Sequence, residues 1–476
     1  MKKLIALLIG ALAITGLSAE KSLVWPRFRG PDGSGVADGQ KPPVEFGPDK
    51  NVKWKSAVPS GLSSPIIAGD KVVITGFEGG KLYTIAYKVK DGTESWRTEA
   101  PAKKLEGYHK TEGSPATSTP ATDGKRIVSY FGSCGLFCYD LSGKELWKYE
   151  MPTVATGGDF GSGVSPIIAE DKVVLVRDEL KESKIIALDA ATGTRKWEQK
   201  RLSATSYCTP VVWNTPNGKE IVAAGHARMV GYDLKTGGEK WYFNGMPSGC
   251  IPSPVVAEGT LYFAGGGGGA DDKDFQMPSF DSMLKDLDKD HDGVLSREEA
   301  DQAMQGFFDN QDANHDGKIT RDEWDAILKY MSEGKNSAFA LKTGGAGDIT
   351  SSHVLWKKTK GLPWITSAIL YRGQYIMVKD GGIVTAYDAK SGDQVYQERV
   401  ATGGQYYASP IAANGNIYFT SLQDGIVTVL KAGGEKPEVL ATNPKLGERT
   451  APTPAIADNT LFVRTATHLY AFAEKK

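Results

Sequence analysis

Cysteine is scarce in this chain, with only four among 476 residues. Small secreted scaffolds held together by disulfides carry a far higher share, so that class of protein is excluded. Four cysteines allow three complete pairings, and the sequence does not choose among them. Buried thiols and a single disulfide are both compatible with the sequence. The four residues are Cys134, Cys138, Cys208 and Cys250.

An excess of charge of one sign is also missing. The formal net charge is −1, whereas nucleic-acid-binding proteins carry strongly basic surfaces. After residue 17, no stretch reaches the 18 apolar residues that would indicate a membrane-spanning helix. We therefore expect no nucleic-acid partner, and no transmembrane segment in the mature chain.

The first residues have the form of an export signal. Lys2 and Lys3 precede an apolar run over residues 4–17, and the small residues Ser18 and Ala19 follow. This pattern predicts a cleavable signal peptide over residues 1–19, with an uncleaved anchor as the alternative. No cysteine lies near the cleavage region, which argues against a lipoprotein. The mature protein is predicted to be periplasmic or secreted.

A Ser/Thr-Pro step followed by alternating apolar residues recurs along the chain. Successive copies are separated by 42–55 residues, except for one interval of 114 residues. That interval leaves an insertion of about 70 residues, and repeats of this length indicate a solenoid or a propeller. An eighth copy has Ser367-Ala368 in place of the Ser-Pro step. The prolines of the other copies are Pro65, Pro120, Pro166, Pro210, Pro254, Pro410 and Pro454.

A second signature follows inside each repeat, and Asp189, Thr192-Gly193 and Trp197 form its clearest copy. The spacing predicts a strand, a tight turn and another strand, because Asp can cap a turn and Gly can adopt positive φ. Four short strands per repeat, repeated eight times, predict an all-β fold, an eight-bladed β-propeller. Residues 51–58, which contain Trp54, are expected to supply the last strand of the final blade and so close the ring.

The Ala-x-Asp-x-x-Thr-Gly-x-x-x-Trp pattern resembles the repeats of pyrroloquinoline-quinone (PQQ) type propellers. The resemblance covers residues 20–264 and 337–476. It includes the leading stretch from Trp25 to Pro31 and the segment Gly347-Asp348-Ile349-Thr350, and it implies the propeller fold. The repeat motif is expected to serve packing between blades rather than quinone binding.

The insertion, expected at residues 265–336 in the fifth blade, has a different composition. Residues 271–335 contain 18 acidic and 8 basic side chains. Two twelve-residue segments inside it match the EF-hand calcium loop, which supplies oxygen ligands from positions 1, 3, 5, 7, 9 and 12 around a glycine at position 6. The first set of predicted ligands is Asp288, Asp290, Asp292, Val294, Ser296 and Glu299. The second set is Asp312, Asn314, Asp316, Lys318, Thr320 and Glu323.

Two matches in tandem predict two calcium sites. Val294 and Lys318 would contribute backbone carbonyls, and Leu295 and Ile319 are expected to pair the loops through a short β contact. The first loop offers one more carboxylate than the second, so we expect it to bind more tightly. Helices are predicted over residues 280–287, 297–308 and 323–331. Since the loops begin only 24 residues apart, the middle helix is expected to be shared or bent.

Two functions remain compatible with these patterns. The favoured prediction is an exported, calcium-binding and non-catalytic propeller that presents a face to another protein or to a polysaccharide. The alternative, implied by the resemblance, is a PQQ-dependent alcohol or sugar dehydrogenase. Such enzymes carry adjacent cysteines, and no Cys-Cys pair occurs here. Trp364 could stack on a quinone, but we expect it to pack at a blade junction.

Overall fold

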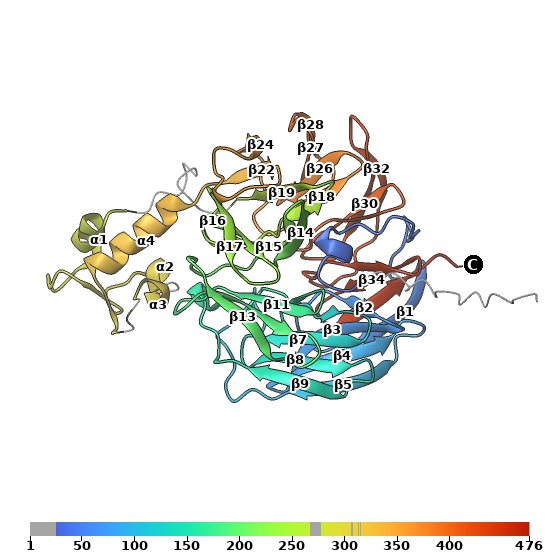
Figure 1. Cartoon of the computed structure of the whole chain (residues 1–476), viewed down its shortest axis with the longest axis horizontal. Helices are drawn as coiled ribbons and strands as arrows, with labels where there is room; N and C mark the ends of the chain where they lie inside the picture. The colour runs from blue at the N-terminus through green and yellow to red at the C-terminus, as the bar shows by residue number, and fades with distance from the viewer. Residues whose placement is uncertain (1–24, 267–277, 306–307, 313, 315, 476) are drawn as a thin grey trace, which may run out of the picture.

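The computed structural model describes residues 25–475, apart from 267–277, 306–307, 313 and 315. The predicted signal peptide, residues 1–19, lies outside the described residues. Within these residues the chain forms eight β-sheets arranged as a ring, with a small helical module projecting from one side (Figure 1). The predicted eight-bladed β-propeller with a helical insertion in its fifth blade is confirmed.

Each blade has at least four antiparallel strands. The first blade contains β2 (Ile66–Ala68), β3 (Lys71–Glu78), β4 (Lys81–Lys88) and β5 (Glu94–Ala100), and the second contains β6 (Ala121–Thr122), β7 (Arg126–Phe131), β8 (Gly135–Asp140) and β9 (Glu145–Glu150). The third blade contains β10 (Ile167–Ala169), β11 (Lys172–Arg177), β12 (Lys184–Asp189) and β13 (Arg195–Lys200), and the fourth contains β14 (Val211–Thr215), β15 (Gly218–Ala224), β16 (Arg228–Asp233) and β17 (Glu239–Asn244).

The fifth blade contains β18 (Val255–Ala257), β19 (Thr260–Gly265), β22 (Ser337–Leu341) and β24 (Val354–Lys358), and the sixth contains β25 (Ile369–Tyr371), β26 (Gln374–Lys379), β27 (Ile383–Asp388) and β28 (Gln394–Arg399). The seventh blade contains β29 (Ile411–Ala413), β30 (Asn416–Thr420), β31 (Val427–Lys431) and β32 (Glu438–Thr442), and the eighth contains β33 (Ala455–Ala457), β34 (Thr460–Arg464), β35 (His468–Phe472) and β1 (Val52–Ala57).

The eighth blade joins segments from near both ends of the chain. β1 pairs antiparallel with β35, and Trp54 lies opposite Ala471. Because the last sheet draws its fourth strand from the N-terminal side, backbone hydrogen bonds within one blade hold the two ends of the propeller together.

The Ser or Thr of each repeated step, which precedes a proline in seven copies and Ala368 in the eighth, forms a specific hydrogen bond at the inner end of its blade. Its backbone amide donates a hydrogen bond to the hydroxyl of the equivalent residue in the next blade, over 2.9–3.1 Å, and the eight bonds form a closed ring. All eight side chains are buried. A proline restricts the residue before it to an extended conformation, which explains the recurring Ser/Thr-Pro step. The ring contains Ser64, Thr119, Ser165, Thr209, Ser253, Ser367, Ser409 and Thr453.

The repeated tryptophans join neighbouring blades. The Trp147 indole N–H donates to the Ala190 carbonyl over 3.0 Å, and its ring covers Gly193 of the same turn. Trp197 contacts the next turn equivalently, through Leu234 and Gly237. The motif therefore serves packing between blades, as the sequence predicts.

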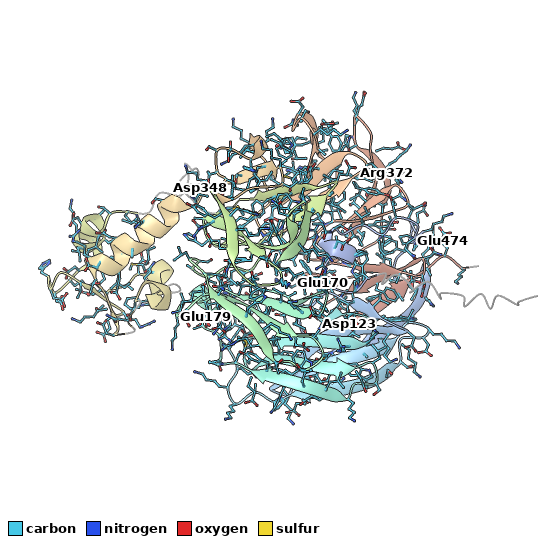
Figure 2. All side chains as sticks on the ribbon, in the orientation of Figure 1. Asp123, Glu170, Glu179, Asp348, Arg372 and Glu474 are labelled. Carbon is cyan, nitrogen blue, oxygen red and sulfur yellow. The ribbon has the colours of Figure 1, made fainter. Side chains whose placement is uncertain are left out.

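The pattern breaks between the fourth and fifth blades. The indole N–H of Trp241 donates to Glu220 over 2.7 Å instead of to a turn of the next blade. The fifth blade has an extended segment in place of that turn, and its β23 (Gly347–Asp348) pairs in parallel with β17. Asp348 lies on the side of the propeller from which the helical module projects (Figure 2). The blade that holds the insertion thus also carries an extra strand to its neighbour.

Candidate metal centre

The helical module is inserted between β19 and β22, two strands that pair directly. Gly265 lies opposite Ser337 in this pairing. α1 (Phe280–Leu287) leads into the first predicted calcium loop, and α4 (Arg321–Glu333) begins inside the second. Between the loops lie the short helices α2 (Gln302–Gln305) and α3 (Phe308–Gln311). Phe280, Phe308 and Trp324 belong to a small apolar core of the module.

In the first loop, three predicted ligands come together at the end of α1. Oxygen atoms of Asp288, Asp290 and Asp292 all lie within 4.8 Å of one another. Asp288 is 8% exposed, and its Oδ2 accepts a hydrogen bond from the amide of Gly293 over 3.1 Å. Its Oδ1 is buried and has no hydrogen-bond partner among the described residues. A buried, unpaired carboxylate oxygen beside two other carboxylates is costly unless a cation joins them.

The position-twelve residue of this loop is already oriented. Glu299 Oε2 accepts hydrogen bonds from the amide and the hydroxyl of Ser296, and Oε1 accepts one from the amide of Lys289. These donors stabilise the ionised carboxylate and lower the pKa of Glu299 to about 2. Val294, at position seven, directly precedes β20 (Leu295–Ser296).

The second loop repeats this geometry. Asp312 is 2% exposed, and its Oδ2 accepts a hydrogen bond from the amide of Gly317 over 2.8 Å. Asn314 Nδ2 donates to Asp316 Oδ2 over 3.1 Å. Thr320 is the N-cap of α4, and its amide and hydroxyl both donate to Glu323 Oε2 in a capping box. The side chain at position twelve is therefore fixed by the start of α4.

The two loops are joined as the sequence predicts. Leu295 pairs with Ile319 between β20 and β21 (Lys318–Ile319), which confirms the short β contact. An ion pair also crosses between the loops, since Lys318 Nζ lies 3.0 Å from Asp292 Oδ2. The ammonium group lowers the pKa of Asp292. The second loop thus supplies a cation to a predicted ligand of the first.

The helix predictions are confirmed at the two ends of the module and wrong in its middle. α1 has the predicted bounds, and α4 begins two residues before the predicted start. The helix expected to start at residue 297 begins only at Gln302, because residues 297–299 form a turn and residue 300 a bend. Twelve residues between two loops are too few for two full helices, so the chain turns instead.

The module contacts the propeller at two places. α3 lies against η2 (Gly157–Asp159), in the connector between the second and third blades. At the base of the module, the amide of Lys335 donates to the carbonyl of Met246 over 2.8 Å. Met246 belongs to the connector between the fourth and fifth blades. The segment carrying the second loop therefore has direct contacts with two blade connectors.

The centre of the ring is occupied by the N-terminal segment, visible near the middle of Figure 1 together with η1 (Pro31–Gly33). Amides of Ile67 and Thr122 donate to the carbonyls of Trp25 and Pro26, and the amide of Ala412 donates to Gly35. The segment is thus hydrogen-bonded to the innermost strands of the first, second and seventh blades. The sequence of this segment resembles that of PQQ-type propellers, but it did not predict the position of the segment at the centre of the ring.

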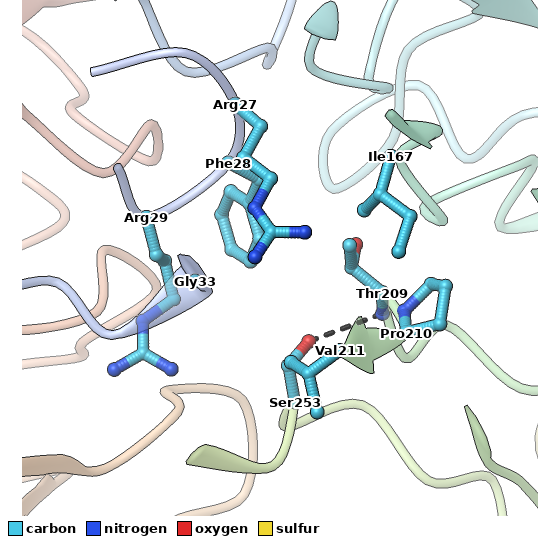
Figure 3. Close-up of a pocket in the computed structure, with 9 residues that line it drawn as sticks. All are labelled: Arg27, Phe28, Arg29, Gly33, Ile167, Thr209, Pro210, Val211 and Ser253. Atoms are coloured by element: carbon cyan, nitrogen blue, oxygen red, sulfur yellow. Dashed lines mark hydrogen bonds between the residues drawn. The ribbon is translucent and has the colours of Figure 1, made fainter. Parts of the chain in front are cut away.

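Little space remains beside this segment. A cavity lined by Arg27, Phe28, Thr209 and Ser253 holds about 10 Å³ (Figure 3), roughly one water molecule. A tricyclic quinone does not fit there. Trp364, expected at a blade junction, is instead 60% exposed on the connector before β25, so that expectation is wrong.

Among the buried charged residues that the sequence does not mark are an ion pair and a carboxyl group. Asp178 and Arg201 form an ion pair with two hydrogen bonds, at 2.7 and 3.1 Å. Glu106 is 2% exposed and accepts hydrogen bonds from the amide and hydroxyl of Ser162. Burial raises the pKa of Glu106 to about 7. No sequence signal marked these residues, because the partners lie in separate loops of the chain.

Comparison with known proteins agrees with the sequence resemblance over most of the chain. The family model described as outer membrane protein assembly factor BamB matches residues 44–159, 109–270 and 344–476. The chain belongs to this family. The EF-hand model matches residues 280–299 and 304–328, within the insertion. The BamB family model therefore covers the propeller, whereas the insertion is similar to EF-hand proteins.

Individual BamB-family relatives are distant. Outer membrane protein assembly factor BamB of Burkholderia pseudomallei is 26% identical over 207 residues, which are 42% of this chain and 48% of that protein. The match thus spans about half the length of the relative. The BamB structure from Moraxella catarrhalis has a TM-score of 0.52 at 13% identity, covering 88% of this chain and 98% of its own. A europium-containing methanol dehydrogenase has a TM-score of 0.51 at 10% identity, covering 93% and 96% respectively. These structures share the fold.

Proposed function

We propose that this protein is an exported propeller that binds two calcium ions through its insertion and acts as a non-catalytic scaffold. The observation that carries the calcium part is the unpaired, buried Oδ1 of Asp288 within a cluster of three carboxylates. Calcium takes six to eight hard oxygen ligands, and the two loops present the matching side chains. The first ion would be held by Asp288, Asp290, Asp292, Val294, Ser296 and Glu299. The second would be held by Asp312, Asn314, Asp316, Lys318, Thr320 and Glu323.

Calcium binding would offset the local excess of ten negative charges in residues 271–335 and stabilise the module by mass action. Extracellular calcium modules commonly have dissociation constants near 10⁻⁴–10⁻³ M. Sites of this strength would be loaded in calcium-rich surroundings. Since α3 contacts η2 and directly precedes the second loop, ordering of that loop supports a fixed position of the module on the propeller.

The scaffold part is supported by what fills the centre of the ring. PQQ-type enzymes hold their quinone in the propeller channel, whereas here residues 25–37 occupy the centre and leave a cavity the size of one water molecule. The family and the Burkholderia relative carry the name of an outer membrane assembly factor. A face of this propeller would accordingly bind another protein, with a polysaccharide as the other candidate.

Export is supported by the N-terminal sequence, in which two lysines precede an apolar run and small residues. Among the described residues, no helix combines the length and the apolar character that crossing a membrane requires. The proposed location is the periplasm or the exterior of the cell.

Calcium titration by calorimetry tests the sites. The double variant Glu299→Gln/Glu323→Gln removes one charge from position twelve of each loop and should weaken both sites at least about tenfold, or about 1.4 kcal/mol. Glu298→Gln/Asp322→Asn is the matched control, because it removes the same charge from position eleven, which supplies no ligand. Undiminished binding in the first variant, or equal loss in both, would reject the ligand assignment.

The alternative, a PQQ-dependent alcohol or sugar dehydrogenase, has a direct test. Purified protein is mixed with PQQ and calcium, and reduction of an acceptor dye is followed with a panel of alcohols and sugars. We expect no reduction above the level seen without protein. Sustained, substrate-dependent reduction would overturn the scaffold proposal and leave the calcium proposal unaffected.

A further inference from the structure

Two of the four cysteines lie side by side between the fourth and fifth blades. Cys208 is in the connector before β14, and Cys250 is in the connector before β18. Their Sγ atoms are 3.1 Å apart, and both side chains are at most 1% exposed. A disulfide needs an S–S distance of about 2.05 Å. An approach of about 1 Å therefore separates the two thiols from a covalent bond.

We propose that Cys208 and Cys250 form a disulfide that joins the fourth and fifth blades in the exported protein. The proposal rests on the export part of the proposed function, since such bonds persist in oxidising compartments. The backbone is already in place. The amide of Tyr207 donates to the carbonyl of Cys250 over 2.9 Å, and the amide of Thr209 donates to the Ser253 hydroxyl over 3.1 Å. The two connectors thus lie alongside each other on both sides of Cys208.

The other two cysteines do not form an equivalent pair. Cys138 is in β8, and Cys134 is in the turn that enters this strand. The three residue steps from Gly135 to Cys138 within β8 alone span roughly 10 Å, beyond the roughly 7 Å between Cα atoms that a disulfide tolerates. We therefore assign Cys134 and Cys138 as thiols.

The bond would form by two thiol–disulfide exchanges with an oxidant of the disulfide class. One cysteine thiolate attacks a sulfur of the oxidant, giving a mixed disulfide and releasing one thiol. The second cysteine thiolate attacks the protein sulfur of the mixed disulfide, forming the Cys208–Cys250 bond and releasing the second thiol. Two electrons and two protons pass from the cysteine pair to the oxidant. Because both thiols are buried in the folded ring, the exchange belongs to folding, before these blades close.

The Cys208–Cys250 disulfide would also affect the calcium module, because it lies next to the base of the insertion. The connector that contains Cys250 also holds the base of the insertion, since the hydroxyl of Ser337 donates to Gly245 over 2.9 Å and the amide of Lys335 donates to Met246. A disulfide would fix this connector to the fourth blade. The base of the insertion would then stay in place when the loops bind or release calcium.

Alkylation followed by intact-mass measurement tests the proposal. The mature chain is directed to the periplasm of a bacterial host by a standard secretion signal, then denatured and treated with iodoacetamide with or without prior reduction. We expect two alkyl groups without reduction, four after it, and a peptide that links residues 208 and 250. Cys208→Ser/Cys250→Ser should take up two groups under both conditions. Four groups without reduction, or a bond that includes Cys134 or Cys138, would overturn the proposal.

The secretion signal separates this test from the test of export. If the natural N-terminus fails to direct export while the bond forms in the periplasmic material, the export proposal fails and the disulfide assignment stands. Protein refolded in the presence of a reductant should melt about 4 °C below the oxidised protein. The Cys208→Ser/Cys250→Ser variant should show no such shift, and an equal shift in the variant would count against the bond.

Discussion

Lys318 has two separate relationships with the calcium loops. Its backbone carbonyl occupies position seven of the second loop, whereas its side chain forms an ion pair with Asp292, a predicted ligand of the first loop. Calcium bound at the proposed first site would have to compete with this ammonium group for the Asp292 carboxylate. The first loop has more carboxylates than the second, which favours calcium binding there. The Lys318 ammonium group of the second loop partly offsets this advantage.

Replacing this lysine should strengthen the first site. Lys318→Gln keeps the backbone carbonyl and removes the competing charge, so we expect the first site to bind calcium about 2- to 5-fold more tightly, the size of an exposed ion pair. Calorimetry at low ionic strength measures the effect, and added salt should reduce it. Lys329→Gln, an exposed lysine on α4, is the control. Unchanged affinity in Lys318→Gln would show that the ion pair does not compete.

Glu106 should make the stability of the protein depend on pH. Its pKa rises from an ordinary 4.5 to about 7 in the folded state because burial disfavours the charged form. The folded state therefore holds the proton more tightly than the unfolded chain does. The stabilisation from this group is fully present below about pH 4.5 and is lost as the pH rises through about 7.

Glu106→Gln removes this titration. Relative to the native protein, the variant should gain stability between pH 5 and pH 8, by up to about 3 kcal/mol. Denaturant unfolding at a series of pH values measures the difference. Glu435→Gln, at an exposed position, should leave the profile unchanged. A profile of Glu106→Gln parallel to that of the native protein would show that Glu106 does not titrate in this range.

At the scale of elements, the turn between third and fourth strands is where neighbouring blades meet. Gly193 has a φ of 71°, and a methyl group there would lie 2.6 Å from ring carbons of Trp147. The glycine is thus required twice, once by its backbone conformation and once by the tryptophan of the preceding blade. This explains why the Thr-Gly step and the tryptophan recur together in the sequence.

A pair of alanine variants separates these two requirements. Gly259 has a φ of 77°, but a methyl group there would meet no atom within 4 Å. We expect Gly259→Ala to cost about 1 kcal/mol of unfolding free energy, from the backbone alone. Gly193→Ala should cost about 3 kcal/mol, because the ring must also move. Equal losses in denaturant titrations would show that the turn does not depend on the tryptophan contact.

For the whole molecule, the insertion and the propeller are separable in the covalent chain. Gly265 and Ser337 lie opposite each other in adjacent strands, so the chain leaves and re-enters the blade across one strand spacing. Two strands at this distance can be joined by a two-residue turn. The ring of eight hydrogen bonds and the contact between β1 and β35 involve no residue of the insertion.

Replacing residues 266–336 by Asn-Gly should therefore leave a folded propeller without calcium binding. We expect retention of the β-sheet circular dichroism and of a cooperative unfolding transition, together with loss of the calorimetric calcium signal. The matched protein is the full chain with Glu299→Gln/Glu323→Gln, which keeps the insertion. Loss of cooperative unfolding in the deletion variant alone would show that the propeller needs the contacts of α3 with η2.

Some features of this protein follow from the sequence by itself. Eight similar repeats predict eight blades because each repeat specifies its own strands and turns through residues close in sequence. The calcium loops are similarly local, since twelve consecutive residues supply Asp288, Glu299 and the other predicted ligands. The middle of the module could not be predicted in this way, because the turn after Glu299 depends on how two loops pack against each other.

Only the tertiary structure decided the remaining features. The N-terminal segment from Trp25 fills the centre of the ring, Cys208 meets Cys250, Glu106 lies in a buried connector, and Lys318 reaches Asp292. Each of these arrangements joins residues that are far apart in sequence. Their burial and distances are set by the packing of separate blades and loops, which the local pattern of side chains does not encode.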